Sequence, residues 1–166
     1  MAHSFIHAKN QNTERSVALP DSLLRIFIYF FNVVLKQQGS LSARENKIYK
    51  HYIIELIEVH TSYMDLLLEE ISNNRQLKRW YLSILSQLEL KLGDFDGYIN
   101  HEYLNQVPEL LIGYPPNTEV FTKPIPVLTL KNLINDICWV LNEDDRHKTR
   151  AFFHLYNWHL TTCERL

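Results

Sequence analysis

The sequence predicts an all-α protein, a single-domain irregular helical bundle of about five or six helices. Only four glycines and six prolines occur in 166 residues, which favours long helices over a turn-rich β fold. The apolar fraction of 46% and the charged fraction of 22% are those of a globular chain. A chain of this length buries enough surface to be stable without disulfides or metals. We therefore expect one helical domain.

The N-terminal segment, residues 1–19, reads MAHSFIHAKNQNTERSVAL and is mainly polar, without helical or strand periodicity. Such a segment is poorly ordered unless apolar side chains tie it down. We therefore predict a flexible N-terminal arm over 1–19, docked through Phe5 and Ile6, followed by a helical domain over 20–166.

The first predicted helix runs from Pro20 to about Gln38, where Gly39 ends it. Its apolar residues, in the stretch LLRIFIYFFNVVL at 23–35, cover most of the helix circumference, which is typical of a helix buried on all sides. The same stretch is too short to cross a membrane, which needs roughly 20 apolar residues. We expect a central core helix and no membrane span.

A second, longer helix is predicted over 42–72. Ser42 and Glu45 have the spacing of a capping box, in which each side chain accepts a hydrogen bond from the backbone amide of the other residue. The apolar periodicity continues to about Ser72, and Asn73 and Asn74 then turn the chain. The sequence therefore predicts one continuous rod.

Further helices are predicted at about 75–92, 95–106, 129–141 and 143–163. Between them, the connection at 107–127 holds five of the six prolines. A connection of this length and irregularity is uncommon in a compact domain and is often functional, although a short β-hairpin or packing across the bundle also fits.

The predicted rod carries an acidic face. The carboxylates on this face are those of Glu55, Glu58, Asp65 and Glu69. They fall within about 80° of one another when a helix is projected at about 100° per residue, and no lysine or arginine occurs between His51 and Asn74. A surface of one charge speeds encounter with an oppositely charged partner. We expect these residues to bind a protein with a basic surface; the alternative is an ordinary solvated face.

A second stretch without basic residues runs from Leu92 to Thr122. Its carboxylates are those of Asp94, Asp96, Glu102, Glu109 and Glu119. Part of it, GDFDGYINHE, partly resembles a calcium loop, but Leu92 stands at the first ligand position and Glu102 falls one residue short of the twelfth. We expect Asp94 or Asp96 to cap the next helix instead.

The last predicted helix is rich in histidine, yet its geometry does not favour a metal site. His154 and His159 lie roughly 140° apart around the helix, so they cannot converge on one ion. The sequence contains neither HExxH nor a repeated ExxH pattern. Cys138 and Cys163 form no CxxC pair. We predict no metal site and no cofactor.

The segment Arg150-Ala-Phe-Phe-His154-Leu-Tyr156 resembles the Arg-spacer-His motif of HEPN-family ribonucleases. These are small all-α dimers in which arginine and histidine pair across subunits to cleave RNA, and toxins of the family carry His-x-Tyr. The family has four to six residues between the arginine and the histidine, whereas three stand here. The resemblance implies an alternative function, a ribonuclease with Arg150, His154 and Tyr156 as catalytic residues.

A third hypothesis is a bundle that holds an apolar ligand or cofactor among its aromatic side chains. The candidates are Phe27, Phe30, Phe31, Trp139, Phe152 and Trp158. Aromatic residues at helical spacing more often form the core, which makes this reading an alternative.

The leading interpretation is a non-enzymatic protein-binding protein, such as a toxin-neutralising (immunity or antitoxin) protein or an adaptor. A net charge of −2 gives no basic footprint for DNA. The basic start, apolar run and small-residue cleavage site of a signal peptide are missing from the N-terminal residues. We expect a cytoplasmic protein with a protein partner, and enzymatic activity stays open.

Overall fold

The computed structural model describes residues 3–9, 14–57 and 64–141, and it confirms the predicted fold class, because the chain is mostly helical with little sheet. The helices are α1 (Asp21–Leu35), α2 (Ala43–Ile57), α3 (Leu68–Ser72), α4 (Arg75–Leu92), α5 (His101–Asn105), α6 (Pro108–Leu111) and α7 (Val127–Leu141). The strands are β1 (His3–Lys9), β2 (Glu14–Pro20), β3 (Tyr98–Ile99) and β4 (Ile125–Pro126). No described helix is long and apolar enough to cross a membrane.

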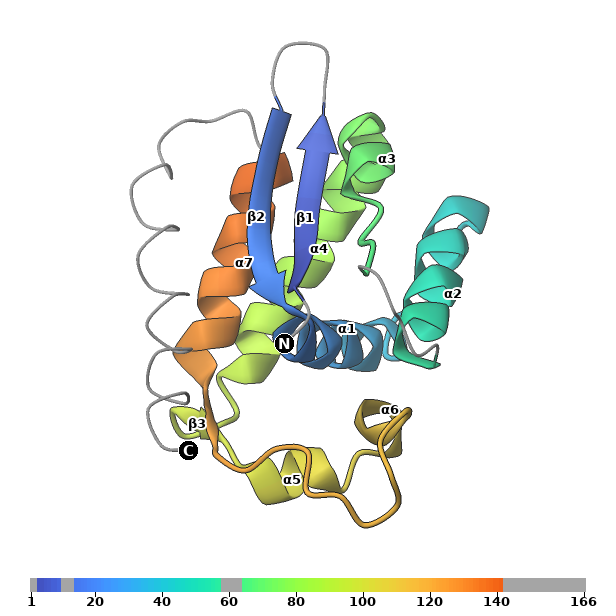
Figure 1. Cartoon of the computed structure of the whole chain (residues 1–166). Helices are drawn as coiled ribbons and strands as arrows, with labels where there is room; N and C mark the ends of the chain where they lie inside the picture. The colour runs from blue at the N-terminus through green and yellow to red at the C-terminus, as the bar shows by residue number, and fades with distance from the viewer. Residues whose placement is uncertain (1–2, 10–13, 58–63, 142–166) are drawn as a thin grey trace.

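Helix α1 is the central helix, as its apolar circumference predicts. Ten of its fifteen residues are buried, and it contacts α2, α4 and α6. Helices α4 and α7 pack beside each other above it (Figure 1). The predicted helices over 75–92 and 129–141 are confirmed as α4 and α7.

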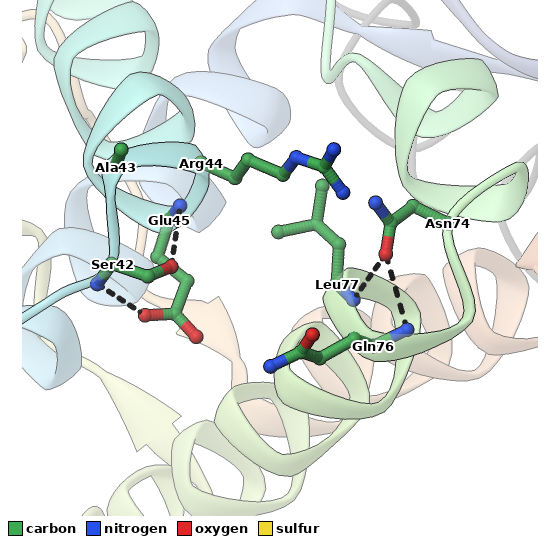
Figure 2. A pocket seen from close by; sticks show the side chains of 7 residues that line it. All are labelled: Ser42, Ala43, Arg44, Glu45, Asn74, Gln76 and Leu77. Carbon is green, nitrogen blue, oxygen red and sulfur yellow. Dashed lines mark hydrogen bonds between the residues drawn. The ribbon is translucent and has the colours of Figure 1, made fainter.

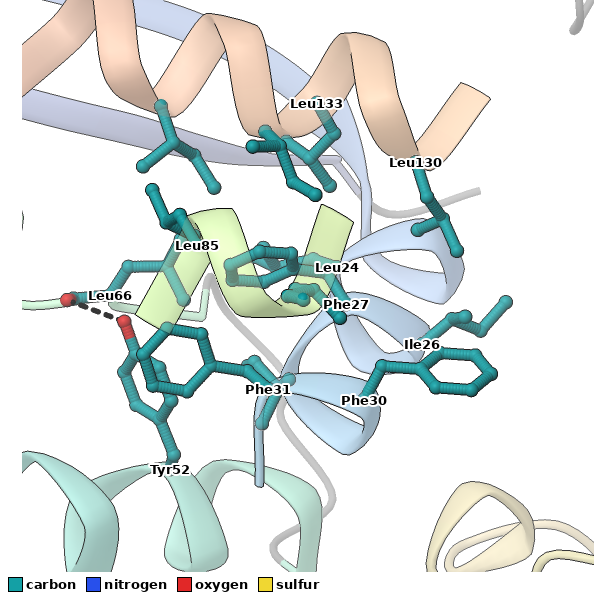
Figure 3. Close-up of a cluster of buried hydrophobic side chains, with 14 of the residues drawn as sticks. Leu24, Ile26, Phe27, Phe30, Phe31, Tyr52, Leu66, Leu85, Leu130 and Leu133 are labelled. Atoms are coloured by element: carbon teal, nitrogen blue, oxygen red, sulfur yellow. Dashed lines mark hydrogen bonds between the residues drawn. The ribbon is translucent and has the colours of Figure 1, made fainter. Parts of the chain in front are cut away.

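The core contains two fully buried tyrosines, Tyr52 and Tyr81, whose hydroxyl groups are hydrogen-bonded to each other. Figure 3 shows the further bond from Tyr52 to Leu66. Tyr52 donates its proton to the carbonyl oxygen of Leu66 at 3.0 Å, and its oxygen lies 2.6 Å from that of Tyr81. Because Tyr52 has only one proton, Tyr81 is the donor between them. The ring of Phe31 packs on both, with centroids 5.2 Å from Tyr52 and 4.9 Å from Tyr81. Burial raises the pKa of both hydroxyls, so they stay protonated.

The predicted rod over 42–72 is wrong, because the helix breaks midway. Its start is as predicted: Ser42 N donates to Glu45 Oε2 at 2.7 Å and Glu45 N to Ser42 Oγ at 3.4 Å. Helix α2 is described as far as Ile57, however, and residues 64–67 are not helical before the short α3 begins at Leu68. Leu67, just before α3, has a left-handed backbone with φ 54°, which α-helices exclude.

The break has a physical cause in the segment 64–68. Met64, Leu66 and Leu68 are buried while Asp65 between them is exposed, so burial alternates as in an extended chain rather than following a helical period. Side chains of α2 hold this segment alongside the helix, through Tyr52 to the Leu66 carbonyl and His51 Nε2 to the Asp65 carbonyl at 2.9 Å. The apolar residues of this segment have helical spacing in the sequence, but hydrogen bonds from Tyr52 and His51 stabilise an extended conformation instead.

Residues 3–9 and 14–20 form a pair of antiparallel strands, whereas the sequence predicted no regular structure over 1–19. Strand β1 pairs antiparallel with β2, from His3 opposite Pro20 to Lys9 opposite Glu14. The strand pair packs on α3 and α7 (Figure 1), and Leu19 is fully buried. Backbone hydrogen bonds between the two strands stabilise these residues, although their sequence shows no strand periodicity. That residues 1–19 move as a flexible arm stays a prediction.

The helix predicted over 95–106 is correct only for its last turns. Helix α5 begins at His101, and Asn100 caps it by accepting from Glu102 N at 3.0 Å. The expected capping role of Asp94 or Asp96 is therefore wrong, and Asp94 instead pairs with Lys91 at 2.9 Å. Strand β3 precedes α5 and pairs with β4. The connection 107–127 is irregular apart from α6 and β4.

Candidate functional site

The four carboxylates expected to bind a partner do not form one row on the described residues. Glu55 has a side chain that is only 7% exposed, and its Oε1 lies 3.3 Å from His51 Nε2. Asp65 and Glu69 are exposed but follow the break in the helix. Glu58 lies outside the described residues. Partner binding by these residues stays a prediction, although the continuous helix face on which it rested is absent.

The ribonuclease residues Arg150, His154 and Tyr156 also lie outside the described residues, so that alternative stays a prediction. Within 3–9, 14–57 and 64–141, no group of three or more His, Cys, Asp or Glu side chains could hold a metal ion.

The aromatic residues proposed for an apolar ligand pack on other side chains where they are described. Phe27 and Phe31 have ring centroids 5.7 Å apart, and Phe30 meets Phe95 edge to face at 5.6 Å. Trp139 is half-buried on α7 and packs against the core. Phe152 and Trp158 lie outside the described residues. An apolar ligand therefore stays an untested alternative.

A pocket of about 260 Å³ lies between the first turns of α2 and α4 (Figure 2). It is lined by Ser42, Ala43, Arg44, Glu45, Asn74, Gln76 and Leu77. Free amides at helix N-termini attract anions, but several amides here already have side-chain partners. The capping box occupies those of Ser42 and Glu45, and Asn74 Oδ1 accepts from Gln76 N and Leu77 N at 3.1 and 3.0 Å.

The chemistry available in this pocket is limited to polar contacts. Glu45 places a carboxylate beside Arg44, so the lining carries both charges. The Ser42 hydroxyl serves as a helix cap, and none of the seven lining residues is a histidine or cysteine that could activate it or act as a nucleophile. The pocket can hold a polar group, but its lining contains no catalytic set.

Asp136 is a buried acid on α7. Its Oδ2 has no hydrogen-bond partner among the described residues, and burial raises its pKa to about 7. A carboxyl group with a raised pKa is one sign of an active site. Asp136 does not line the pocket between α2 and α4, however. We therefore expect Asp136 to affect the pH dependence of stability.

The exposed segment between α6 and β4 has a defined shape. Tyr114 N donates to the Leu111 carbonyl at 3.1 Å, with Ile112 at φ −59°, ψ 131° and Gly113 at φ 90°, which is a type II turn. A second turn follows, closed from Thr118 N to the Pro115 carbonyl at 3.2 Å. Asn117 occupies its third position with φ 62°, a conformation that asparagine tolerates better than most residues.

Two polar side chains fix this segment to the bundle. Arg25 on α1 donates through Nη2 to the carbonyl oxygens of Leu56, Glu109 and Ile112 at 3.1, 3.1 and 3.2 Å. Asn105 on α5 donates to the Phe121 carbonyl at 2.7 Å and accepts from the amides of Val120 and Phe121 at 3.1 and 3.0 Å. Both ends of the exposed segment are therefore held by hydrogen bonds.

Tyrosines lie beside this segment at the surface. Tyr103 is 39% exposed, and its hydroxyl lies 3.2 Å from that of Tyr29 on α1. Tyr114, within the segment, is 43% exposed. Glu109 lies close enough to Tyr29 to contribute to a raised pKa of its hydroxyl, after burial and the Tyr103 hydrogen bond. We call residues 112–124 together with Tyr29, Tyr103 and Glu109 the loop surface.

The sequence signalled only part of the loop surface. Its prolines and the absence of lysine and arginine from Leu92 to Thr122 were visible from composition. Arg25 was visible only as the single charge inside LLRIFIYFF, which indicates a need for partners because a buried charge must be hydrogen-bonded. Nothing in the sequence marked Asn105, since its partners lie fifteen and sixteen residues away.

Comparisons with known protein families, with characterised proteins and with solved structures found no match.

Proposed function

We propose that the protein acts by binding another protein through the loop surface, without catalysis. The observation that supports this proposal is an exposed loop held rigid by Arg25 and Asn105. A loop that is already ordered loses little conformational entropy on binding, so more of its contact energy is available for affinity. Long ordered loops on a rigid scaffold are a common place for recognition residues.

The composition of the loop surface fits the same proposal. Tyrosine is enriched in protein interfaces because it offers a large rigid contact area with a hydroxyl group at its end. Tyr103 and Tyr114 are both well exposed. Residues Leu92 to Thr122 contain carboxylates and no lysine or arginine, so the expected partner has a basic surface. A toxin neutralised by this protein would be one such partner.

The test compares Tyr114→Ala with wild type in affinity capture from a lysate, with bound proteins identified by mass spectrometry. Tyr114 is expected to be an interface anchor, so its truncation should weaken capture of the partner at least about tenfold. The matched control is Tyr98→Ala, since Tyr98 is also exposed but lies outside the loop surface. A set of captured proteins that is the same for wild type, control and Tyr114→Ala would exclude the loop surface as the binding site.

A further inference from the structure

One corner of the loop surface brings two phenol groups and a carboxylate together. Arg25 and Tyr29 lie one turn apart on the same face of α1. Arg25 holds the Glu109 carbonyl at 3.1 Å, which places the first turn of α6 next to Tyr29. Tyr103 reaches the same point from α5, with its hydroxyl 3.2 Å from that of Tyr29.

The aromatic rings at this corner are fixed by packing. The Tyr103 ring is stacked on Phe30 with an interplanar angle of 22° and a centroid distance of 6.4 Å, and it also contacts Phe95 at 5.9 Å. Tyr29 meets Phe30 edge to face at 5.1 Å. Phe30 is buried in the core, so the two tyrosines are anchored from below while Tyr103 remains accessible from solvent.

The negative charge at this corner has no cationic partner among the described residues. No ion pair joins Glu109 to a lysine or arginine of the described part of the chain. The adjacent cation, Arg25, donates to the backbone carbonyls of Leu56, Glu109 and Ile112, and burial lowers its pKa. The sequence supplies no other basic residue between Lys91 and Lys123.

We infer that Tyr29, Tyr103 and Glu109 form a binding site for a lysine or arginine side chain presented by the protein partner. A cation is favoured by the face of an anchored tyrosine ring and by an adjacent carboxylate. The hydroxyl pair offers a proton donor and an acceptor beside it. An anion would meet the Glu109 carboxylate, and a neutral side chain would leave that charge uncompensated. This inference rests on the proposed function and names the chemistry of its partner.

The experiment titrates the whole protein with a blocked Gly-Arg-Gly peptide and follows backbone amide shifts by NMR. The comparison peptide carries citrulline, which has nearly the shape of arginine without its charge. We expect saturable shifts at Tyr103 and Glu109 with a dissociation constant in the millimolar range for the arginine peptide, and at least fivefold weaker binding for citrulline. Glu109→Gln should weaken arginine binding about fivefold, whereas Glu89→Gln on the exposed side of α4 should not change it.

Equal shifts with the two peptides, or unchanged binding in Glu109→Gln, would overturn the cation site. This titration needs no natural partner, so its outcome is separate from the capture experiment with Tyr114→Ala. If arginine binding fails while Tyr114→Ala still loses the partner, the loop surface remains the binding site and only the cation chemistry is wrong. If arginine binds as expected, the site is supported whichever protein is captured.

Discussion

The core around Tyr52 and the loop surface are ordered by different means. In the core, apolar side chains from α1, α2 and α4 enclose Tyr52 and Tyr81, and few polar groups need partners. At the loop surface most residues from Gly113 to Pro124 are exposed, and the side chains of Arg25 and Asn105 supply the order by binding backbone groups. We therefore expect the hydrogen bonds of this loop to break at a lower free energy than global unfolding requires, because breaking them exposes little apolar surface.

The largest expected effect on global stability is that of Tyr52→Phe. The substitution removes the hydroxyl that joins the Leu66 carbonyl to Tyr81, and the buried carbonyl then lacks its partner. Such a loss costs about 1–3 kcal/mol. Denaturant unfolding followed by circular dichroism should show this loss of free energy, while Tyr98→Phe at the surface should change it by a few tenths of a kcal/mol. A Tyr52→Phe protein as stable as wild type would mean that the core does not depend on this pair.

The next effect concerns pH and the buried carboxyl group of Asp136. Its pKa is raised from 3.8 to about 7 by burial, so the unfolded chain releases this proton more readily than the folded one. Its contribution to stability is therefore full below about pH 4 and is lost as pH rises through about 7. Asparagine cannot ionise, so Asp136→Asn should be more stable than wild type at pH 8, by on the order of 1 kcal/mol, and not at pH 4.

This pH effect belongs to the core and not to the loop surface, because Asp136 is buried on α7. It should appear in global unfolding curves measured at pH 4, 6 and 8, with the exposed Asp96→Asn as the matched control. A stability difference between Asp136→Asn and wild type that is constant across this range would show that Asp136 does not titrate as a buried acid.

The smallest global effect should come from Asn105→Ala, which acts locally. The amides of Val120 and Phe121 lose the acceptor that protects them, so their hydrogen exchange measured by NMR should accelerate about tenfold, equivalent to 1.4 kcal/mol. Amides in α4, such as that of Leu85, should keep their protection. Asn135→Ala, at an exposed position of α7, is the matched control. Equal acceleration throughout α4 would break the distinction between loop and core.

Much of the fold could be predicted because apolar periodicity and helix caps are local signals. The central position of α1, the spans of α4 and α7, and the capping box of Ser42 with Glu45 all follow from neighbouring residues. The non-helical segment 64–67 could not, because it depends on Tyr52 and His51 binding carbonyl groups fourteen residues away. The formation of β1 and β2 likewise depends on pairing between residues 3–9 and 14–20.

The candidate site divides in the same way. Composition identified the proline-rich connection as a region of interest, and it identified the surplus of carboxylates from Leu92 to Thr122. The contacts that give this region a shape come from Arg25 and Asn105, whose partners are distant in the sequence. The acidic row predicted on one helix failed for a related reason: Glu55 turned toward His51 and became buried.

The small sheet of β3 and β4 has a consequence for how this protein can vary. Tyr98 stands opposite Pro126, and Val127 N donates to the Gly97 carbonyl at 2.9 Å, so the segment 100–124 begins and ends at one place. Residues inserted, deleted or exchanged near Pro116 would leave the ends of α4 and α7 where they are. We therefore expect the sequence of this segment to be exchangeable for other recognition sequences while the helices around it keep their positions.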